Sequence, residues 1–109
     1  MVLHKTSFSL ICEQPDAIDA LDPDINQLEK VQILFLSINT IERMIPLPGL
    51  MNLKLLSLSS NKIKRIEGLK EVGKTLEELW ISFNYIEKLS GLDHCDVLHT
   101  LLIGDNRIS

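Results

Sequence analysis

Residues 53–63 of this chain read Leu53-Lys54-Leu55-Leu56-Ser57-Leu58-Ser59-Ser60-Asn61-Lys62-Ile63. The same arrangement of apolar residues before and after an asparagine occurs three more times, around Asn39, Asn84 and Asn106. Successive asparagines are separated by 22, 23 and 22 residues. A period in this range is typical of a solenoid, in which each unit buries its apolar residues by stacking on its neighbours.

The repeated unit is identified as a leucine-rich repeat. Leu56 and Leu58 are expected to point inward from a short strand, with Ser57 pointing outward between them. The asparagine that follows offers a carbonyl acceptor and two N–H donors to backbone groups that no strand reaches. We therefore predict an α/β leucine-rich-repeat solenoid, with a curved parallel sheet on its concave face and short helical or 3₁₀ segments on its convex face. Its structural asparagine ladder consists of Asn39, Asn61, Asn84 and Asn106.

The sequence predicts one domain over residues 1–109. An irregular N-terminal unit covers residues 1–28, where Phe8 and Leu10 suit a strand and Ile18 and Leu21 suit later core positions. The excess length of this unit includes Asp22-Pro23, a helix start with Asp as N-cap and Pro in the first turn. Repeats cover about residues 29–109, and the last is incomplete. Because solenoids normally end in a polar capping unit, we interpret the chain as truncated at its C-terminus.

Composition limits the classes of function. The chain has 109 residues, of which 45% are hydrophobic and 5% aromatic, so the predicted core is aliphatic. Its net charge of −4 argues against a nucleic-acid-binding surface. No apolar run reaches the roughly 18–20 residues that a membrane span needs. Cys12 and Cys95 are expected to stay reduced in an intracellular compartment.

The outward residues of the four repeats form three predicted columns on the concave face. The first two columns are unusually apolar, and exposed apolar clusters of this size mark binding surfaces. Trp80 is the natural anchor of such a surface. We therefore predict a protein-binding face; the alternative is that another segment of the same chain covers it. The columns are Ile33, Leu55, Glu78 and Thr100; Phe35, Ser57, Trp80 and Leu102; and Ser37, Ser59, Ser82 and Gly104.

Catalytic and metal chemistry are not predicted. His94, Cys95 and His99 lie close in sequence, but zinc needs four ligands and the remaining candidates are at the other end of the stack. No glycine-rich phosphate loop and no nucleophile elbow occur. We expect no enzyme, no cofactor, no metal and no small-molecule substrate. The basic run of Lys62, Lys64, Arg65, Lys70 and Lys74 is interleaved with Glu67 and Glu71, which favours a solvated convex face over nucleic-acid binding.

Residues 76–89 carry a more specific resemblance. The chain there reads Leu76-Glu77-Glu78-Leu79-Trp80-Ile81-Ser82-Phe83-Asn84-Tyr85-Ile86-Glu87-Lys88-Leu89. This string resembles the outer-arm axonemal dynein light chain 1 family, a leucine-rich-repeat family of the 22-residue subclass, and the similarity runs from about Ile18 to Ser109. The repeat is also similar to that of phosphatase-regulating repeat proteins and the spliceosomal A-prime protein.

The resemblance implies a non-catalytic, protein-binding subunit of the motor that drives cilia and flagella. Such a subunit docks on a dynein heavy chain through the apolar sheet face, modulates motility and lies close to tubulin or the microtubule. The implied location is the cytoplasm and cytoskeleton, at the axoneme, with no nucleic-acid or membrane partner. The N-terminal helical segment of the family is mostly missing here, and its C-terminal repeats and helical cap are absent. A regulatory subunit of a protein phosphatase and a spliceosomal adaptor are the alternatives.

The predicted partner-binding residues have two origins. Four match the family string or its counterpart in the preceding repeat, and four are assigned from the geometry of a strand alone. The first group is Ser57, Glu78, Trp80 and Ser82, and the second is Ile33, Phe35, Leu55 and Leu102.

Overall fold

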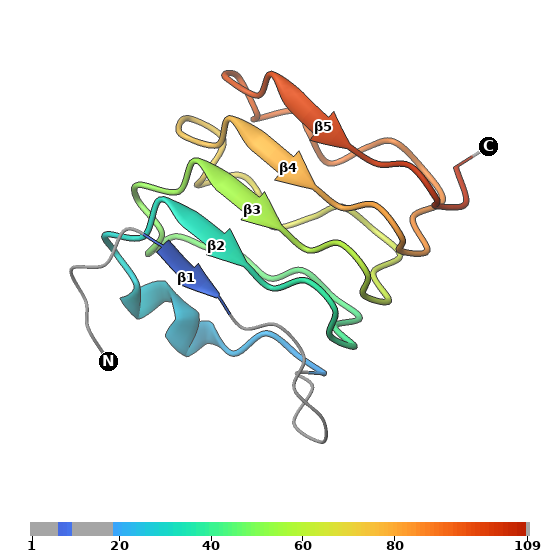
Figure 1. Ribbon diagram of the computed structural model, residues 1–109. Helices are drawn as coiled ribbons and strands as arrows, with labels where there is room; N and C mark the ends of the chain where they lie inside the picture. The colour runs from blue at the N-terminus through green and yellow to red at the C-terminus, as the bar shows by residue number, and fades with distance from the viewer. Residues whose placement is uncertain (1–6, 10–18, 109) are drawn as a thin grey trace.

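The described residues form a parallel sheet of five short strands, and each strand belongs to the repeat after that of the strand before it (Figure 1). A computed structural model describes residues 7–9 and 19–108, so the expectations for Leu10, Cys12 and Ile18 lie outside the described residues. The strands follow the order β1-β2-β3-β4-β5 in sequence and in space. They are β1 (Ser7–Ser9), β2 (Ile33–Phe35), β3 (Leu55–Ser57), β4 (Glu78–Trp80) and β5 (Thr100–Leu102). This is the predicted leucine-rich-repeat solenoid.

The strand register places equivalent positions of successive repeats side by side. Leu34 pairs with Leu56, Leu56 with Leu79 and Leu79 with Leu101. At the other edge, Phe8 pairs with Leu34. One residue per strand points inward and its two neighbours point outward, so the register fixes the columns on both faces of the sheet.

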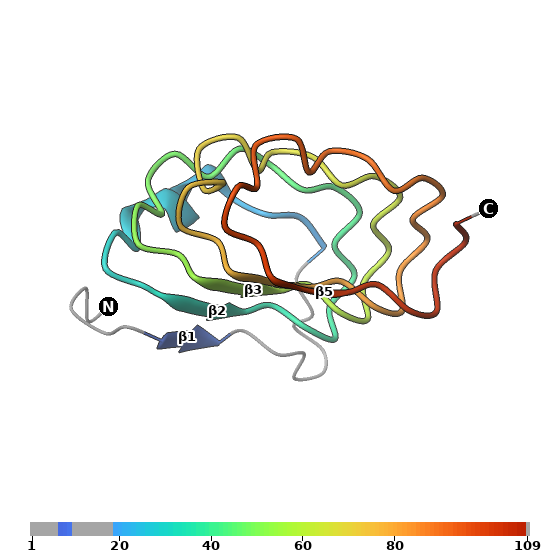
Figure 2. The ribbon, with the colours of Figure 1, turned by 90° about the horizontal axis from the view of Figure 1, so that it is seen from above.

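An aliphatic core fills the space behind the sheet. Figure 2, seen from above, shows the strands along one side and irregular segments along the opposite, convex side. Leu34, Leu56 and Leu79 reach the core from the sheet, and Ile63, Ile66 and Ile86 reach it from segments after the asparagines. Leu98, Leu101 and Ile103 of the last described repeat are only partly buried, because within the described residues no unit stacks on their far side.

The convex side carries one 3₁₀ helix, η1 (Pro23–Gln27), within the described residues. The side chain of its N-cap, Asp22, accepts a hydrogen bond from Asp24 N at 2.9 Å, as the Asp-Pro pair predicts. Other repeats cross this side in turns. The extra residue of the 23-residue repeat is accommodated in the turn at residues 70–75, where Thr75 N and Leu76 N both donate to Val72 O.

The asparagines tie neighbouring repeats together. Asn61 Nδ2 donates to Leu58 O of its own repeat at 2.9 Å and to Leu36 O of the preceding repeat at 3.0 Å. Its Oδ1 accepts from Ile41 N at 3.0 Å. Asn84 and Asn106 repeat this arrangement one and two units later. Each amide therefore satisfies backbone groups of two repeats at once.

A left-handed residue precedes each ladder asparagine. Ile38, Ser60, Phe83 and Asp105 have φ angles of 57°, 58°, 58° and 55°. This conformation turns the chain out of the sheet direction and delivers the next residue, asparagine, into the interior. Non-glycine residues rarely adopt it, and bulky or β-branched ones least of all. The backbone thus accepts local strain in every repeat to position the ladder.

Candidate protein-binding face

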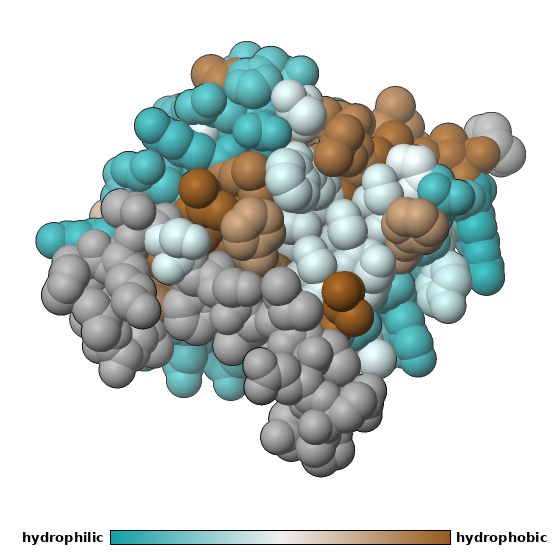
Figure 3. All heavy atoms as spheres, in the orientation of Figure 1, coloured by the Kyte–Doolittle hydropathy of each residue, from teal (hydrophilic) through white to brown (hydrophobic). Residues whose placement is uncertain are grey.

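The concave face is the side of the sheet that faces away from the core, and Figure 3 looks onto it. Strand pairing places Ile33 beside Leu55, Leu55 beside Glu78 and Glu78 beside Thr100. A second column runs from Phe35 through Ser57 and Trp80 to Leu102. Apolar side chains gather there beside small polar ones.

A third column follows the strands. Backbone hydrogen bonds continue past the last strand residues, from Ile38 N to Ser59 O, Ser60 N to Ser82 O and Phe83 N to Gly104 O. Ser37, Ser59 and Ser82 therefore stack beside one another and lead to Gly104. These residues are small, so this part of the face is open to close approach by a partner backbone.

The two aromatic residues of the second column contact each other. Their ring centroids are 5.9 Å apart and their planes meet at 52°. Phe35 is on β2 and Trp80 is on β4, two strands away, so their backbones are roughly 9–10 Å apart. The rings must therefore lean toward each other over β3. Their separation is within the range of favourable aromatic pairs.

Ser57 lies beneath this aromatic pair. It is 1% exposed, whereas its neighbours Phe35 and Trp80 are half-buried. Its hydroxyl shares a hydrogen bond of 2.6 Å with the hydroxyl of Ser37. Only a small residue leaves room for both rings to meet above it. The structure thus places Ser57 as a support for the rings and not at the accessible surface.

The indole is also fixed from the first column. Trp80 Nε1 donates to Glu78 Oε1 at 3.2 Å. This bond satisfies the only polar atom of the indole side chain and sets the orientation of the ring. It also occupies one carboxylate oxygen of Glu78, the one charged side chain of the three columns. The ring contact and this hydrogen bond therefore hold the indole in one orientation.

The remaining predicted residues surround the aromatic pair. Ile33, Leu55 and Ser82 are half-buried, and Leu102 is 45% exposed at the β5 edge. The three columns bring all eight residues together on one face of the sheet. Sequence reasoning missed Ile38 and Phe83, which are 56% and 59% exposed in the left-handed conformation just after the third column. Neither residue type prefers that conformation, so no sequence signal could have found them.

Residues considered for metal binding do not assemble a site. His99 Nδ1 is 2.9 Å from Thr100 Oγ1, and its Nε2 is 3.4 Å from Glu77 Oε1. Among the described residues, no three His, Cys, Asp or Glu side chains converge as metal ligands would. Searching that same part of the chain for a membrane-spanning helix finds none of sufficient length and apolarity.

A family model described as leucine-rich repeats in two copies matches residues 51–94. The chain is 49% identical over 63 residues to dynein axonemal light chain 1 of Danio rerio and 48% identical over 65 residues to that of Chlamydomonas reinhardtii. The human protein of that name is 46% identical over 61 residues. These matches cover 58%, 60% and 56% of this chain, which itself spans about a third of each relative, 33%, 33% and 32%.

Two solved structures from Listeria monocytogenes have a similar fold. An internalin C2 superposes with a TM-score of 0.72 at 31% identity, over 83% of this chain and 39% of the internalin. A second internalin gives a TM-score of 0.78 at 24% identity, over 94% of this chain and 29% of that one. The second likeness concerns the fold alone.

Proposed function

We propose that this chain is a member of the axonemal dynein light chain 1 family of leucine-rich-repeat proteins, to which it is 46–49% identical over the matched residues. Its role is that of a non-catalytic, protein-binding subunit. The concave face docks on a dynein heavy chain and so modulates ciliary or flagellar motility. In this proposal the chain lies in the cytoskeleton, at the axoneme.

The observation that carries this proposal is the Phe35–Trp80 pair on a sheet face that no other described segment is paired with or packed against. Its rings meet at 5.9 Å, and Glu78 holds the indole in place. Large aromatic side chains supply much of the energy of protein interfaces, and rigid ones lose little conformational entropy on binding. Ile33 and Leu55 extend the apolar area on one side, and Leu102 extends it on the other. A preorganised aromatic centre of this kind is the usual place for a binding hot spot.

The serine column gives the face its second property. Ser37, Ser59 and Ser82 carry short side chains beside the aromatic pair, so a partner can approach the sheet closely there. Their hydroxyl groups can donate and accept hydrogen bonds. Ser82 is the member of this column that we assign to partner contact, whereas Ser57 supports the rings from below.

The test is co-purification of the tagged full chain with axonemal dynein from a flagellar extract, with the heavy chain identified by mass spectrometry. Trp80→Ala should lower the affinity at least about thirtyfold, because truncation of a hot-spot residue costs about 2 kcal/mol or more. Met51→Ala is the matched control, since Met51 is an exposed apolar residue in the turn before β3. Undiminished heavy-chain recovery with Trp80→Ala would defeat the proposal.

One other outcome of the co-purification would identify a different partner. Recovery of a phosphatase catalytic subunit in place of a dynein heavy chain would assign the face to phosphatase regulation. Association with tubulin or the microtubule stays a prediction, and co-sedimentation of the chain with polymerised tubulin, with and without the heavy chain, measures it.

A further inference from the structure

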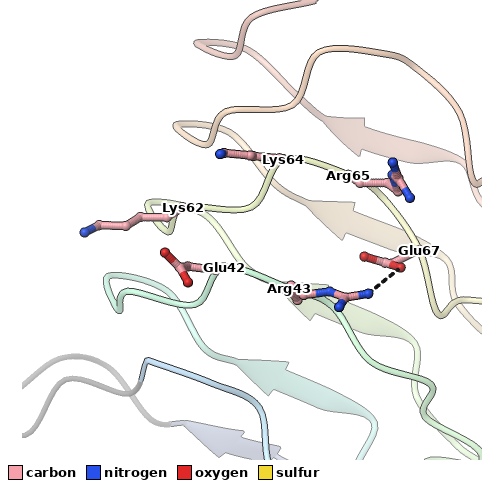
Figure 4. Close-up of a pocket in the computed structure, with 6 residues that line it drawn as sticks. All are labelled: Glu42, Arg43, Lys62, Lys64, Arg65 and Glu67. Carbon is pink, nitrogen blue, oxygen red and sulfur yellow. Dashed lines mark ion pairs between the residues drawn. The ribbon is translucent and has the colours of Figure 1, made fainter.

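A second surface lies away from the concave face, on the segments that follow Asn39 and Asn61. It is a hollow of about 480 Å³, named here the lateral hollow. Figure 4 shows its side chains: Lys62 and Lys64 extend to one side, whereas Arg43 extends toward Glu67. The hollow is lined by Glu42, Arg43, Lys62, Lys64, Arg65 and Glu67.

The lateral hollow is positively charged. Four cations face two carboxylates, a local excess of two positive charges on a chain whose net charge is −4. Glu67 is engaged by Arg43, with 3.6 Å between Oε1 and Nη2. Within the described part of the chain, no ion pair reaches Lys62, Lys64 or Arg65. Glu67 and Glu71 both interrupt the basic run in sequence, but in the structure only Glu67 lines the hollow beside the cations.

The repeat register concentrates this charge. Lys62 N donates to Ile41 O at 2.8 Å and Tyr85 N donates to Ile63 O at 2.8 Å, so the segments after successive asparagines run side by side. In this register the fourth residue after each of the first three ladder asparagines is a cation, namely Arg43, Arg65 and Lys88. Stacked like charges repel one another. An acidic partner would relieve this repulsion.

We propose that the lateral hollow binds an acidic segment of another polypeptide, independently of the concave face. Carboxylates of the segment pair with Lys62, Lys64 and Arg65. A polypeptide can also present a basic or amide side chain to Glu42, which a nucleic-acid backbone cannot do. Glu42 and Glu67 would repel a uniform polyanion, as would the negative charge of the chain as a whole.

These cations are exposed, so each ion pair is weak and screened by salt. Binding therefore depends on several pairs together and weakens as ionic strength rises. This dependence distinguishes the lateral hollow from the apolar concave face, whose interactions salt does not screen.

Fluorescence anisotropy of a labelled oligoglutamate peptide titrated with the full chain at low ionic strength tests the proposal. Lys62→Glu with Arg65→Glu should weaken binding by about tenfold, from the loss of two ion pairs. The matched control is Lys70→Glu with Lys74→Glu, the same change of net charge outside the hollow, which should retain most of the affinity. Lys62→Gln with Arg65→Gln removes the two positive charges without introducing negative ones, so it should lower the affinity less than the charge-reversed pair does.

Each alternative outcome contradicts the proposal. Equal losses of affinity in the two charge-reversed variants would show that net charge alone, and not the lateral hollow, accounts for the binding. Tighter binding of inorganic polyphosphate than of oligoglutamate would assign the hollow to phosphate anions, and equal binding of oligoglutamine would remove the role of charge. Trp80→Ala should leave binding of the oligoglutamate peptide unchanged. The peptide titration therefore tests the lateral hollow independently of the docking proposed for the concave face.

Discussion

The side-chain carbonyl of Asn84 accepts a hydrogen bond from the backbone N–H of Ile63 at 2.9 Å, so one repeat completes the turn of the repeat before it. Its Nδ2 donates to Leu58 O at 2.9 Å and to Ile81 O at 3.1 Å. Asn84 is buried, and water does not replace these bonds once the amide is removed. The asparagine ladder is therefore both a turn-forming device and the polar link between repeats.

Replacement of Asn84 by alanine should lower the free energy of unfolding by about 2 kcal/mol. It leaves the buried N–H of Ile63 without its acceptor, and such an orphaned group costs about 1–3 kcal/mol before relaxation. Leu58 O and Ile81 O each lose one amide donor but keep the hydrogen bonds from Asn61 and Asn106. Urea denaturation measures the loss. Asn106→Ala is the control: Asn106 makes equivalent bonds but is half-buried, so water reaches its partners and the loss should be about 1 kcal/mol. Equal losses at both positions would contradict this account.

Gly68→Ala should destabilise the chain by about 2 kcal/mol or more. Gly68 has a φ of +77°, and an added Cβ would lie 2.5 Å from Ile45 O, a backbone atom that cannot move aside. Both the conformation and the contact are unfavourable for alanine. Gly104 is the natural comparison, because a Cβ there meets no atom within 4 Å. Thermal denaturation should show a lower melting temperature for Gly68→Ala but not for Gly104→Ala. Equal shifts in the two variants would mean that neither the positive φ nor the contact with Ile45 O determines the stability.

Phe83→Asn should raise the free energy of unfolding by about 0.5–1 kcal/mol. Phe83 holds a φ of 58° and is 59% exposed, so it bears the left-handed conformation with little burial to offset it. Asparagine tolerates this conformation far better than a bulky residue does. Phe83→Tyr keeps the aromatic ring and its strain, and its stability should match that of the unmodified chain in the same urea titration. A destabilised Phe83→Asn would show that contacts of the ring outweigh the strain.

The sequence was sufficient for those parts of the fold that depend on the type of residue at a repeated position. Leu56 and Leu79 had to be inward because leucine recurs there in every repeat, and both are buried in adjacent strands. Asp22 before Pro23 predicted the N-cap of η1 because aspartate is a favoured N-cap residue and proline suits the first helical position. Periodicity and capping are local properties, so a single sequence reveals them.

Features that depend on contacts across repeats could not be predicted. The column positions of Phe35 and Trp80 follow from the strand pattern, but their meeting over Ser57 depends on how far each ring leans. Glu71 follows the basic run closely in sequence, yet it is not among the residues that line the lateral hollow. The left-handed residue before each asparagine has no consistent residue type, so its position is visible only in the backbone.

The thiol of Cys95 should react slowly with iodoacetamide near pH 8. Partial burial raises its pKa above the ordinary value of 9.0, and the neighbouring charges of Asp96 and Asp93 raise it further. Only the thiolate is nucleophilic, so a raised pKa lowers the reaction rate at a given pH. Measurement in a Cys12→Ser variant isolates this thiol. Because burial is the largest cause, unfolding in urea should accelerate alkylation much more than Asp96→Asn, which we expect to add only about two- to threefold.

The same shift makes stability depend on pH at the alkaline end. The folded chain holds the Cys95 proton to higher pH than the unfolded chain does, so between the two pKa values the folded state binds more protons. The free energy of unfolding should therefore fall as pH rises through 9.0 toward the raised value, and Cys95→Ser should remove that part of the slope. Urea titrations of both chains on either side of that pH measure the difference.

For the alkylation rate, a larger effect of Asp96→Asn than of unfolding would show that the neighbouring charge, and not burial, controls the reactivity of the Cys95 thiol.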